Sequence, residues 1–490
     1  MADERTIPLT YAIRGSVVLK YGAQLALIIA ILTAVPLLLA LAESDWILVT
    51  RYTEVCAVLV LLGGLFARLP APASIQGNEA LTITSLTFIL ASLFMAWPFM
   101  GSDISFIDAW FESISSVTTT GLSALGSIEN RSDTFLFARA WMQWYGGLGF
   151  IVLSVALLMG HQSAARRLSD PTESGETLMA TTRTHARRSL YVYLTLTVFG
   201  FVLIWSLMGN GFVALLHVLS AISTGGLSNY DASLAGMISK PAAIAVIMTS
   251  FLGAVSLPLY WQVSHSGWRE GLRSLLSNIE LRTLIIACLL SGSLLSWLGS
   301  TQGGNMSLYH GFMLGFSAQT TAGFATTPVA GMDPASKIVM IISMLTGGSS
   351  GSTAGGFKII RLLIILRLLQ LMLRRTGMPS HAVAEPYLAG QKLEADEIIR
   401  AMQLFFLFTG LMVLSWIPFV FMGYDPLDSL FEVASACGTV GLSSGITRPE
   451  LEPFLKLVLC FDMLAGRLEI FALLVVITPR NWFGRRREMK

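Results

Sequence analysis

The chain has 490 residues, of which 54% are hydrophobic and only 13% are charged. A soluble globular protein carries about 25% charged residues, so this composition excludes an ordinary soluble fold and predicts a protein whose apolar surface faces lipid. The formal net charge of +2 indicates no class of partner. The four cysteines match no disulfide or metal-ligand spacing, and we expect them to pack as small apolar side chains.

Ten segments are long and apolar enough to cross a bilayer, for which about 20 residues are needed. They span residues 17–42, 52–69, 80–100, 136–160, 189–208, 241–263, 281–299, 336–373, 398–422 and 453–478. The eighth is too long for one simple span, and a run of glycine and serine interrupts it. No cleavable signal peptide is expected, because the first apolar run continues to Ala42.

The charges of the connecting loops predict an orientation. Basic residues gather in alternate loops, so the positive-inside rule places these loops and both termini in the cytoplasm. They are Arg166, Arg167, Arg183, Arg187, Arg188, Arg269, Arg273, Arg282, Arg361, Arg367, Arg374, Arg375, Lys392, Arg485, Arg486, Arg487 and Lys490. The opposite loops carry Asp103, Asp108, Glu112, Asp231, Asp333, Asp425, Asp428 and Glu432. An acidic outer face would concentrate cations, although ordinary solvated loop charges explain any single residue equally well.

Segments three to ten form four pairs, and a glycine-containing turn lies between the two members of each pair. In each turn a threonine stands two residues before the glycine, and Leu or Phe and then Ser or Ala follow it. The turns are Thr118-Thr119-Thr120-Gly121, Ser223-Thr224-Gly225-Gly226, Thr320-Thr321-Ala322-Gly323 and Gly438-Thr439-Val440-Gly441. A serine stands six residues before each glycine (Ser115, Ser220, Ser317, Ser435), and a small residue stands twelve before (Ala109, Ala214, Gly311, Ser429). The chain therefore contains a fourfold internal repeat.

The stretch before each turn is about a dozen residues long, and as a helix it would reach about 18 Å, roughly half of the bilayer core. Such a segment enters the membrane, stops midway and returns, which is tolerated only beside water or protein. The carboxyl end of the short helix favours a cation, and glycine allows backbone angles that turn carbonyls toward an axis. Four such loops could replace an ion's hydration shell. Close packing of small residues explains one isolated turn but not four in register.

At these turns the chain resembles the Trk/Ktr/HKT superfamily of potassium transporters, and within it the bacterial TrkH type. The resemblance implies an all-α polytopic membrane protein with four helix–pore-loop–helix repeats in a pseudo-fourfold arrangement around one pore, plus two N-terminal helices. It assigns residues 1–76 to these two helices and residues 77–160, 186–263, 279–375 and 394–490 to the repeats. The sixteen turn residues given above are expected to form the potassium selectivity filter. A serine in the first repeat accompanies sodium transport in the family, so Gly121 favours potassium, whereas Gly225 and Ala322 replace larger residues.

Two further features match the family. The run Gly347-Gly348-Ser349-Ser350-Gly351-Ser352-Thr353-Ala354-Gly355-Gly356 resembles its intramembrane gating loop, and we expect the run to be flexible and to contribute little packing. It lacks the Gly-Lys-Ser/Thr ending of a phosphate-binding loop. Arg467 matches an arginine that lies near this gate in the family, and a charge at that depth is a functional hypothesis by default. A purely structural role, in which Arg467 pairs with Glu469 or Asp462, stays open.

The resemblance implies gated potassium uptake across a bacterial inner membrane by a homodimer with one pore in each subunit. A cytoplasmic nucleotide-binding ring of the TrkA type is the expected regulatory partner, and potassium is the transported ion. No covalently bound cofactor, nucleic-acid partner or enzymatic activity is expected. Two alternatives stay open: a sodium transporter of the same architecture, and a secondary transporter coupled through buried carboxylates, for which Asp462 and Glu469 qualify.

Overall fold

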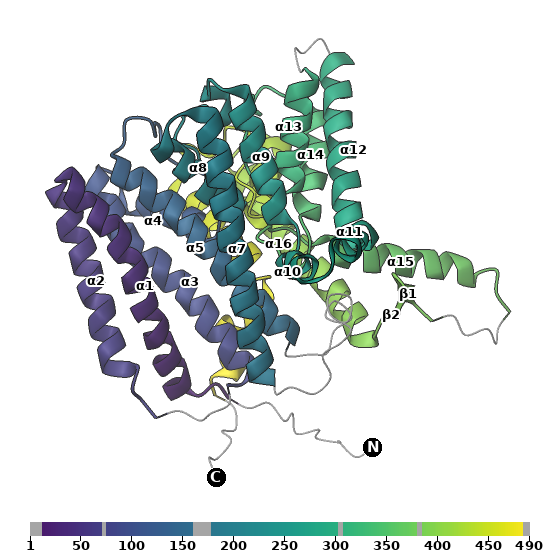
Figure 1. Cartoon of the computed structure of the whole chain (residues 1–490), viewed down its shortest axis with the longest axis horizontal. Coiled ribbons are helices and arrows are strands. Elements are labelled where there is room, and N and C mark those ends of the chain that lie inside the picture. The colour runs from purple at the N-terminus through teal and green to yellow at the C-terminus, as the bar shows by residue number, and fades with distance from the viewer. Residues whose placement is uncertain (1–11, 71–74, 160–177, 302–306, 380–384, 484–490) are drawn as a thin grey trace.

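The computed structural model describes residues 12–70, 75–159, 178–301, 307–379 and 385–483, and these are almost entirely helical (Figure 1). The chain begins with a hairpin of two long helices, α1 (Gly15–Glu43) and α2 (Trp46–Phe66), which pack against each other. Their turn is tight because Ser44 takes a left-handed conformation and the Asp45 side chain accepts a hydrogen bond from the Leu48 amide at 3.2 Å. This arrangement agrees with the two leading helices predicted from the sequence.

Four groups of helices follow, and each contains one helix of 12 residues. The first group is α3 (Gly77–Phe99), η1 (Met100–Ser102), α4 (Phe106–Val117) and α5 (Asp133–Met159). The second is α7 (Leu178–Met208), α8 (Gly211–Ile222), η2 (Ser233–Gly236), α9 (Lys240–Ala254) and α10 (Leu257–His265). The third is α12 (Ile279–Thr301), α13 (Leu308–Gln319), α14 (Pro334–Thr346) and α15 (Ile359–Arg375). The fourth is α16 (Ala395–Phe421), α17 (Pro426–Cys437), α18 (Pro453–Arg467), α19 (Phe471–Ile477) and η3 (Pro479–Asn481).

Two connections complete the fold. The short helix α11 (Trp268–Ser277) joins the second group to the third, and a hairpin of β1 (Tyr387–Leu388) and β2 (Gln391–Lys392) precedes α16. Helix α15 and this hairpin project from the body of the molecule (Figure 1). The short helices α4, α8, α13 and α17 are the dozen-residue stretches that the repeat predicts.

Polar side chains cap the starts of three of the four short helices, whereas Ser307 precedes α13 without a side-chain cap bond. Ser105 caps α4, Asn210 caps α8 and Asp425 caps α17, each with its side chain accepting from backbone N–H groups of the first turn. Such caps satisfy donors that have no partner inside the helix. These three helices therefore begin at a capped residue, and each of the four short helices, at about 1.5 Å per residue, ends about half a membrane away.

The four groups pack in cyclic order. Helix α5 contacts α8, α9 contacts α13, α14 contacts α17, and α18 contacts α4. The helix that follows each short helix therefore lies against the short helix of the next group, and the fourth group returns to the first. This order brings the carboxyl ends of four short helices together, although the chain separates them widely.

Three of the predicted spans are broken in the structure. Six helices in the described residues are long and apolar enough to cross a membrane, namely α1, α2, α3 with η1, α7, α12 and α16. The sixth predicted segment, residues 241–263, is bent by 86° between α9 and α10. The eighth is divided by the Gly/Ser run, as expected. The tenth, residues 453–478, was predicted as one span but is interrupted because Glu469 and Ile470 both adopt positive φ, 54° and 59°, which a right-handed helix cannot continue.

Some of the basic residues behind the predicted orientation are not covered. Residues 166, 167, 485–487 and 490 lie outside the described ranges, and the side chain of residue 183 is not described either. At the two ends of the described chain, the Ile13 amide donates to the Asn481 carbonyl at 2.8 Å. The N-terminal and C-terminal segments therefore lie side by side.

Candidate functional site

The predicted turns follow the short helices directly and share one backbone conformation. We name residues 118–121, 223–226, 320–323 and 438–441 loops 1 to 4. The threonine at the second position has φ of 54°, 53°, 53° and 48° in loops 1 to 4, and the final glycine has φ of 89°, 79°, 77° and 93°. A β-branched residue at positive φ is a rare outlier that costs on the order of 1–3 kcal/mol. Its occurrence at the same position in four loops identifies a conformation that the surrounding fold imposes.

A common hydrogen bond holds each loop against its helix. The amide of the third loop residue donates to the carbonyl of the serine six positions before the glycine. These bonds are Thr120 to Ser115 at 2.9 Å, Gly225 to Ser220 at 2.8 Å, Ala322 to Ser317 at 2.8 Å and Val440 to Ser435 at 2.9 Å. In loops 1 and 4 the serine hydroxyl also accepts from the glycine amide, at 3.0 Å in both. In loops 2 and 3 the corresponding hydroxyls are buried without a hydrogen-bond partner among the described residues.

The four glycines form a closed ring of contacts. Each glycine lies against the carbonyl oxygen of the third residue of the next loop, and no Cβ would fit there. An added Cβ would lie 2.1 Å from the Gly225 oxygen at Gly121, 2.7 Å from the Ala322 oxygen at Gly226, 2.0 Å from the Val440 oxygen at Gly323 and 2.2 Å from the Thr120 oxygen at Gly441. Positive φ and lack of space therefore both require glycine at these positions.

Gln143 explains why loop 2 has glycine at its third position. This α5 side chain is fully buried, and its Nε2 donates to the Gly225 carbonyl at 2.5 Å while its Oε1 accepts from the Leu227 amide at 3.4 Å. A Cβ on Gly225 would lie 2.4 Å from the Gln143 Cδ. The glutamine amide thus occupies the volume of the missing side chain. Gln143 was not predicted, because nothing in the sequence relates it to a loop 82 residues away.

A second set of anchors lies nine residues before the loop glycines. Glu112 accepts from the Ser123 hydroxyl at 2.6 Å, Glu432 accepts from the Ser443 hydroxyl at 2.5 Å, and His217 Nε2 lies 3.2 Å from the Ser228 hydroxyl. In each case the serine stands two residues after the loop glycine. These buried anchors fix the segment that leaves each loop, and the third group has Leu314 at this position. Their fixed distance from the loop glycines is the sequence signal that locates these anchors.

This result corrects the predicted acidic outer face. Glu112 and Glu432 are fully buried, and Glu112 also pairs with Arg139 at 3.0 Å. Others of the predicted acids have structural partners: Asp108 pairs with Lys456, Asp428 pairs with Lys337, Asp231 accepts from the Ile128 amide, and Asp333 and Asp425 cap helices. Lysine partners neutralise Asp108 and Asp428, whereas Asp103, Asp231 and Asp425 are exposed and keep their charges. The prediction is therefore wrong for Glu112 and Glu432.

The Gly/Ser run, residues 347–356, lies against loops 2, 3 and 4. The Gly355 amide donates to the Thr321 hydroxyl of loop 3 at 2.8 Å, and a Cβ on Gly355 would lie 2.1 Å from the Thr439 hydroxyl of loop 4. Thr353 lies 3.5 Å from the Thr224 hydroxyl of loop 2. All these contacts are to the threonines with positive φ. The run therefore lies against the loops that follow the carboxyl ends of α8, α13 and α17.

The expectation that this run contributes little packing is wrong. Ser349, Ser352, Thr353 and Ala354 are buried, and the Thr353 hydroxyl lies 3.0 Å from the Ile222 carbonyl and 2.9 Å from the Gly253 carbonyl. Further contacts are Gln319 Nε2 to the Gly347 carbonyl at 2.9 Å, the Ser350 amide to Glu280 at 2.6 Å and Lys358 to the Ala354 carbonyl. Positive φ at Gly347, Gly351 and Gly356 lets the backbone make these turns. The small residues serve close packing in a non-helical path.

Arg467 is 1% exposed and joins the run to the first group. Its Nη1 donates to the Thr353 carbonyl at 2.9 Å, and its Nη2 donates to the Gly146 carbonyl at 3.3 Å. The acids proposed as structural partners have other contacts: Asp462 accepts from the Ser415 hydroxyl at 2.5 Å, and Glu469 pairs with Arg361 at 2.6 Å. The guanidinium therefore contacts the run itself, as the resemblance implied.

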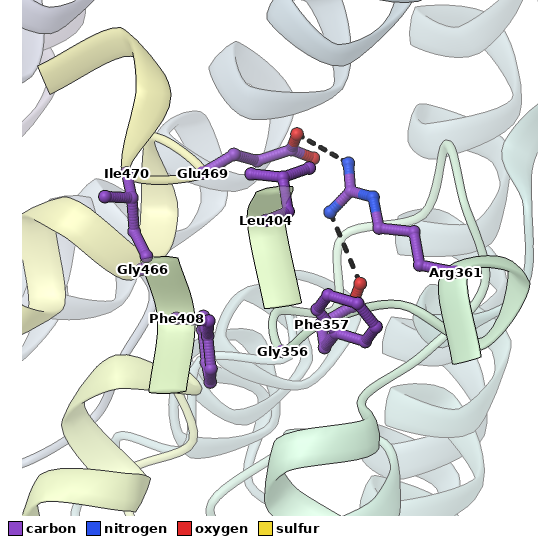
Figure 2. A pocket seen from close by; sticks show the side chains of 8 residues that line it. All are labelled: Gly356, Phe357, Arg361, Leu404, Phe408, Gly466, Glu469 and Ile470. Atoms are coloured by element: carbon purple, nitrogen blue, oxygen red, sulfur yellow. Dashed lines mark hydrogen bonds and ion pairs between the residues drawn. The ribbon is translucent and has the colours of Figure 1, made fainter. Parts of the chain in front are cut away.

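A small cavity lies beside the C-terminal end of the run. Figure 2 shows it between Gly356, Phe357, Leu404, Phe408, Gly466 and Ile470, with the Glu469 carboxylate facing the Arg361 guanidinium. Arg361 also donates to the Phe357 carbonyl at 3.3 Å. The cavity measures about 10 Å³, the lower limit of the space that one water requires. The ion pair thus ties the start of α15 to the break between α18 and α19.

Comparisons with known proteins agree with this geometry. A family model described as TrkH, cation transport protein, matches residues 71–482. The chain is 28% identical to the Trk system potassium uptake protein TrkH of Escherichia coli K12 over 83% of its own length and 86% of that protein. It is 29% identical to the Trk system potassium uptake protein TrkI of Halomonas elongata, over 98% of its own length and 100% of that protein. It is also 28% identical to an uncharacterized cation transporter of Methanocaldococcus jannaschii, over 85% of both chains.

The fold is similar to a solved structure of the same kind. The crystal structure of the potassium transporter TrkH from Vibrio parahaemolyticus superposes with a TM-score of 0.83 at 26% identity, covering 96% of this chain and 100% of that one. The resemblance inferred from the four turns is thereby confirmed. The chain belongs to the TrkH family of cation transport proteins, and it is a multi-pass membrane transporter of potassium or other cations, not an enzyme.

Proposed function

We propose that this chain takes up potassium through a gated, channel-like pathway in which loops 1 to 4 form the selectivity filter. The observation that carries the proposal is the closed ring in which each loop glycine abuts a carbonyl of the next loop. Loops related in this way surround a common axis in a pseudo-fourfold arrangement. Their carbonyl oxygens, at residues 118–121, 223–226, 320–323 and 438–441, replace the hydration shell of the ion.

The proposal keeps the repeat boundaries predicted from the sequence, residues 77–160, 186–263, 279–375 and 394–490, each with one loop, and residues 1–76 as the leading segment. Helix α7 begins at Leu178, before the predicted start of the second repeat. The cyclic packing of the four short helices supports this division. The carboxyl ends of these helices point their partial negative charge toward the same region, which favours a cation there.

The Gly/Ser run closes the pathway below the filter, and Arg467 holds it closed. The run contacts three of the four loops, and Arg467 bonds to its Thr353 carbonyl. Opening requires these buried hydrogen bonds to be exchanged for others. As a gate, the run adopts a second arrangement in which these bonds are broken.

The remaining features concern membrane and partners. The transporter lies in a bacterial inner membrane with both termini cytoplasmic; the contact between Ile13 and Asn481 supports only that the two termini share one side. It forms a homodimer, and the projecting helix α15 exposes apolar side chains suited to such a contact: Leu366, Leu369, Met372 and Leu373. Two curated relatives bear the name of a Trk potassium uptake system, and a TrkA-type nucleotide-binding ring is the proposed regulator.

The test uses purified protein in liposomes with a clamped membrane potential, measuring potassium and sodium flux. Replacing Gly121, Gly226, Gly323 or Gly441 by Ser should lower the potassium-to-sodium flux ratio by roughly tenfold, because overpacking costs about 1–3 kcal/mol and acts where the ion is dehydrated. Gly423→Ser is the matched control, since Gly423 also has positive φ, 85°, but no neighbour within 4 Å.

The control separates backbone strain from filter geometry. If the four loop variants kept the wild-type flux ratio, the filter assignment would be wrong. A wild-type protein that preferred sodium would instead identify the alternative transporter of the same architecture. Flux driven by an imposed pH gradient at zero potential would identify proton coupling through buried carboxylates.

A further inference from the structure

Helix α11 presents an apolar stripe beside a basic stripe. Trp268, Leu272 and Leu276 are 76%, 50% and 61% exposed, and their spacing of four residues places them on one face. Arg269 and Arg273 also stand four residues apart, each directly after a residue of the apolar stripe, and both are exposed. The two stripes therefore run side by side along the helix.

The third face of α11 packs on the protein. Gly271 is buried, and a Cβ there would lie 3.0 Å from the Val263 carbonyl of α10. Because α10 is bent by 86° from α9, α10 and α11 lie across the ends of α9 and α12 (Figure 1). Helix α11 is thus a ledge at one end of the transmembrane helices, with its apolar and basic stripes turned away from the protein.

We propose that this ledge binds anionic phospholipid of the surrounding leaflet. Tryptophan is favoured at the level of lipid headgroups, leucines one and two turns further on contact the acyl chains, and guanidinium groups bond phosphate oxygens in bidentate fashion. An amphipathic helix with arginines beside its apolar face is the form that lies in a membrane interface. Arg188, which lies over the Trp261 ring at 5.6 Å, adds a nearby positive charge, and Glu270 is the exposed acid on α11.

The ledge is joined to the Gly/Ser run through the elbow between α9 and α10, residues 253–257. The Ser349 amide donates to the Ala254 carbonyl at 3.0 Å, and the Thr353 amide donates to the Gly253 carbonyl at 3.1 Å. The Leu257 amide donates back to the Gly351 carbonyl at 3.1 Å. The elbow and the run therefore cannot move independently without breaking buried backbone bonds.

Lipid bound to α11 in this position stabilises this arrangement of the elbow and hence of the run. A ligand shifts an equilibrium toward the state that it binds better, so anionic lipid favours the closed run and slows transport. This step rests on the gating role proposed above. Binding of the lipid to α11 does not rest on it.

The first experiment compares liposomes of phosphatidylcholine with liposomes of three parts phosphatidylcholine to one part phosphatidylglycerol. Potassium flux of the wild type should be at least about twofold lower in the anionic vesicles, and Arg269→Gln with Arg273→Gln should remove the difference. Arg374→Gln with Arg375→Gln, at the end of α15, removes the same charge elsewhere and should behave like the wild type. Equal wild-type flux in both vesicles, or the same loss of lipid dependence in the α15 variant, would overturn the coupling.

The second experiment measures binding without flux. In detergent, phosphatidylglycerol should raise the thermal unfolding midpoint of the wild type and of the α15 variant more than phosphatidylcholine does. The α11 variant should lose this difference, and an undiminished shift in that variant would overturn the lipid site. A wild type that transports no potassium in either vesicle but keeps the shift would refute the proposed function and leave the lipid site standing.

Discussion

Gly225 has no side chain because Gln143 occupies the space beside its Cα and bonds to its carbonyl. The Gln143 amide donates to that carbonyl and fills the space of a side chain, whereas the third residues of the other loops, Thr120, Ala322 and Val440, carry side chains of their own. The glutamine orientation follows from its partners, because a carbonyl needs a donor and an N–H needs an acceptor. Loop 2 is therefore supported by a residue of the preceding group.

This support predicts a rescue. Gly225→Ala should lower the thermal unfolding midpoint and the potassium-to-sodium flux ratio, because its Cβ would lie 2.4 Å from the Gln143 side chain and overpacking costs about 1–3 kcal/mol. The φ of Gly225 is negative, so its backbone accepts alanine. Adding Gln143→Ala should relieve the clash and restore part of both losses.

Gly226 provides the control for this rescue. Its φ is 79°, and its obstruction is the Ala322 carbonyl rather than Gln143. Gln143→Ala should therefore leave the defect of Gly226→Ala unchanged. If Gln143→Ala rescued both variants or neither, the steric account of Gly225 would be refuted.

Residues differ in how far the sequence reveals them. The loop glycines recur at the same position of each repeat, and the buried Glu112, His217 and Glu432 recur nine positions earlier. The sequence repeat therefore locates both the glycines and these anchors. Gln143 belongs to no register, and its role arises only when α5 packs against α8. Glu112 and Glu432 were misassigned to the outer face because a charge pattern does not show hydrogen-bond partners.

At the scale of elements, the Gly/Ser run was predictable as a break but not as a packed structure. A run of glycine and serine in an apolar segment cannot continue a helix at low cost, so its position follows from composition. Its bonds to loops 3 and 2 join residues 34 and 129 positions apart, respectively. The breaks at residues 254–257 and 467–471 carry no glycine or serine run of this kind, and tertiary contacts decide them.

The gate predicts an effect of Arg467 on rate alone. Arg467→Ala removes the donor to the Thr353 carbonyl, and a buried hydrogen bond contributes about 1 kcal/mol. Potassium flux should rise roughly fivefold if that energy favours the closed run, while the potassium-to-sodium ratio stays unchanged because the loops keep their contacts. Flux in liposomes at a clamped potential measures both quantities.

Thr353→Val separates loss of the gate from loss of stability. Valine keeps the shape of threonine but removes the hydroxyl that bonds to the Ile222 and Gly253 carbonyls. It should raise flux in the same direction as Arg467→Ala, and the double variant should be less than additive because both act on one residue of the run. Wild-type flux in two well-folded single variants would contradict the gating role.

At the scale of the molecule, equivalent ion pairs join neighbouring helix groups on the side away from the Gly/Ser run. Lys337 of the third group binds Asp428 of the fourth at 2.5 Å, and Lys456 of the fourth binds Asp108 of the first at 2.6 Å. Both aspartates stand thirteen residues before a loop glycine. Each lysine also donates to the carbonyl seven residues before it, that of Ala330 or Pro449. We call the interface between two neighbouring groups a seam, and this arrangement of a lysine with an aspartate and a carbonyl a clasp. The two seams therefore have the same clasp.

The seam between the second and third groups has a weaker form of this clasp. Lys240 stands fourteen residues after its loop glycine, as Lys337 does, but it is exposed and lies over the Tyr309 ring at 5.7 Å. Such an exposed cation–π contact contributes about 0.5–1 kcal/mol. The lysines at Lys337 and Lys456 are 8% and 5% exposed, so removing either leaves a partly buried carboxylate unpaired.

These differences predict an order of stability. Lys337→Met and Lys456→Met should lower the free energy of unfolding by about 1–3 kcal/mol each, because the aspartates that remain are partly reached by water and cost less than a fully buried charge. Lys240→Met should cost less than either. Because the clasps hold neighbouring loops in contact, the first two variants should also lower the potassium-to-sodium flux ratio, and adding Asp428→Asn or Asp108→Asn should recover part of the stability. Thermal unfolding and liposome flux measure both effects, and a Lys240→Met variant as unstable as the other two would show that the seams do not differ as their contacts indicate.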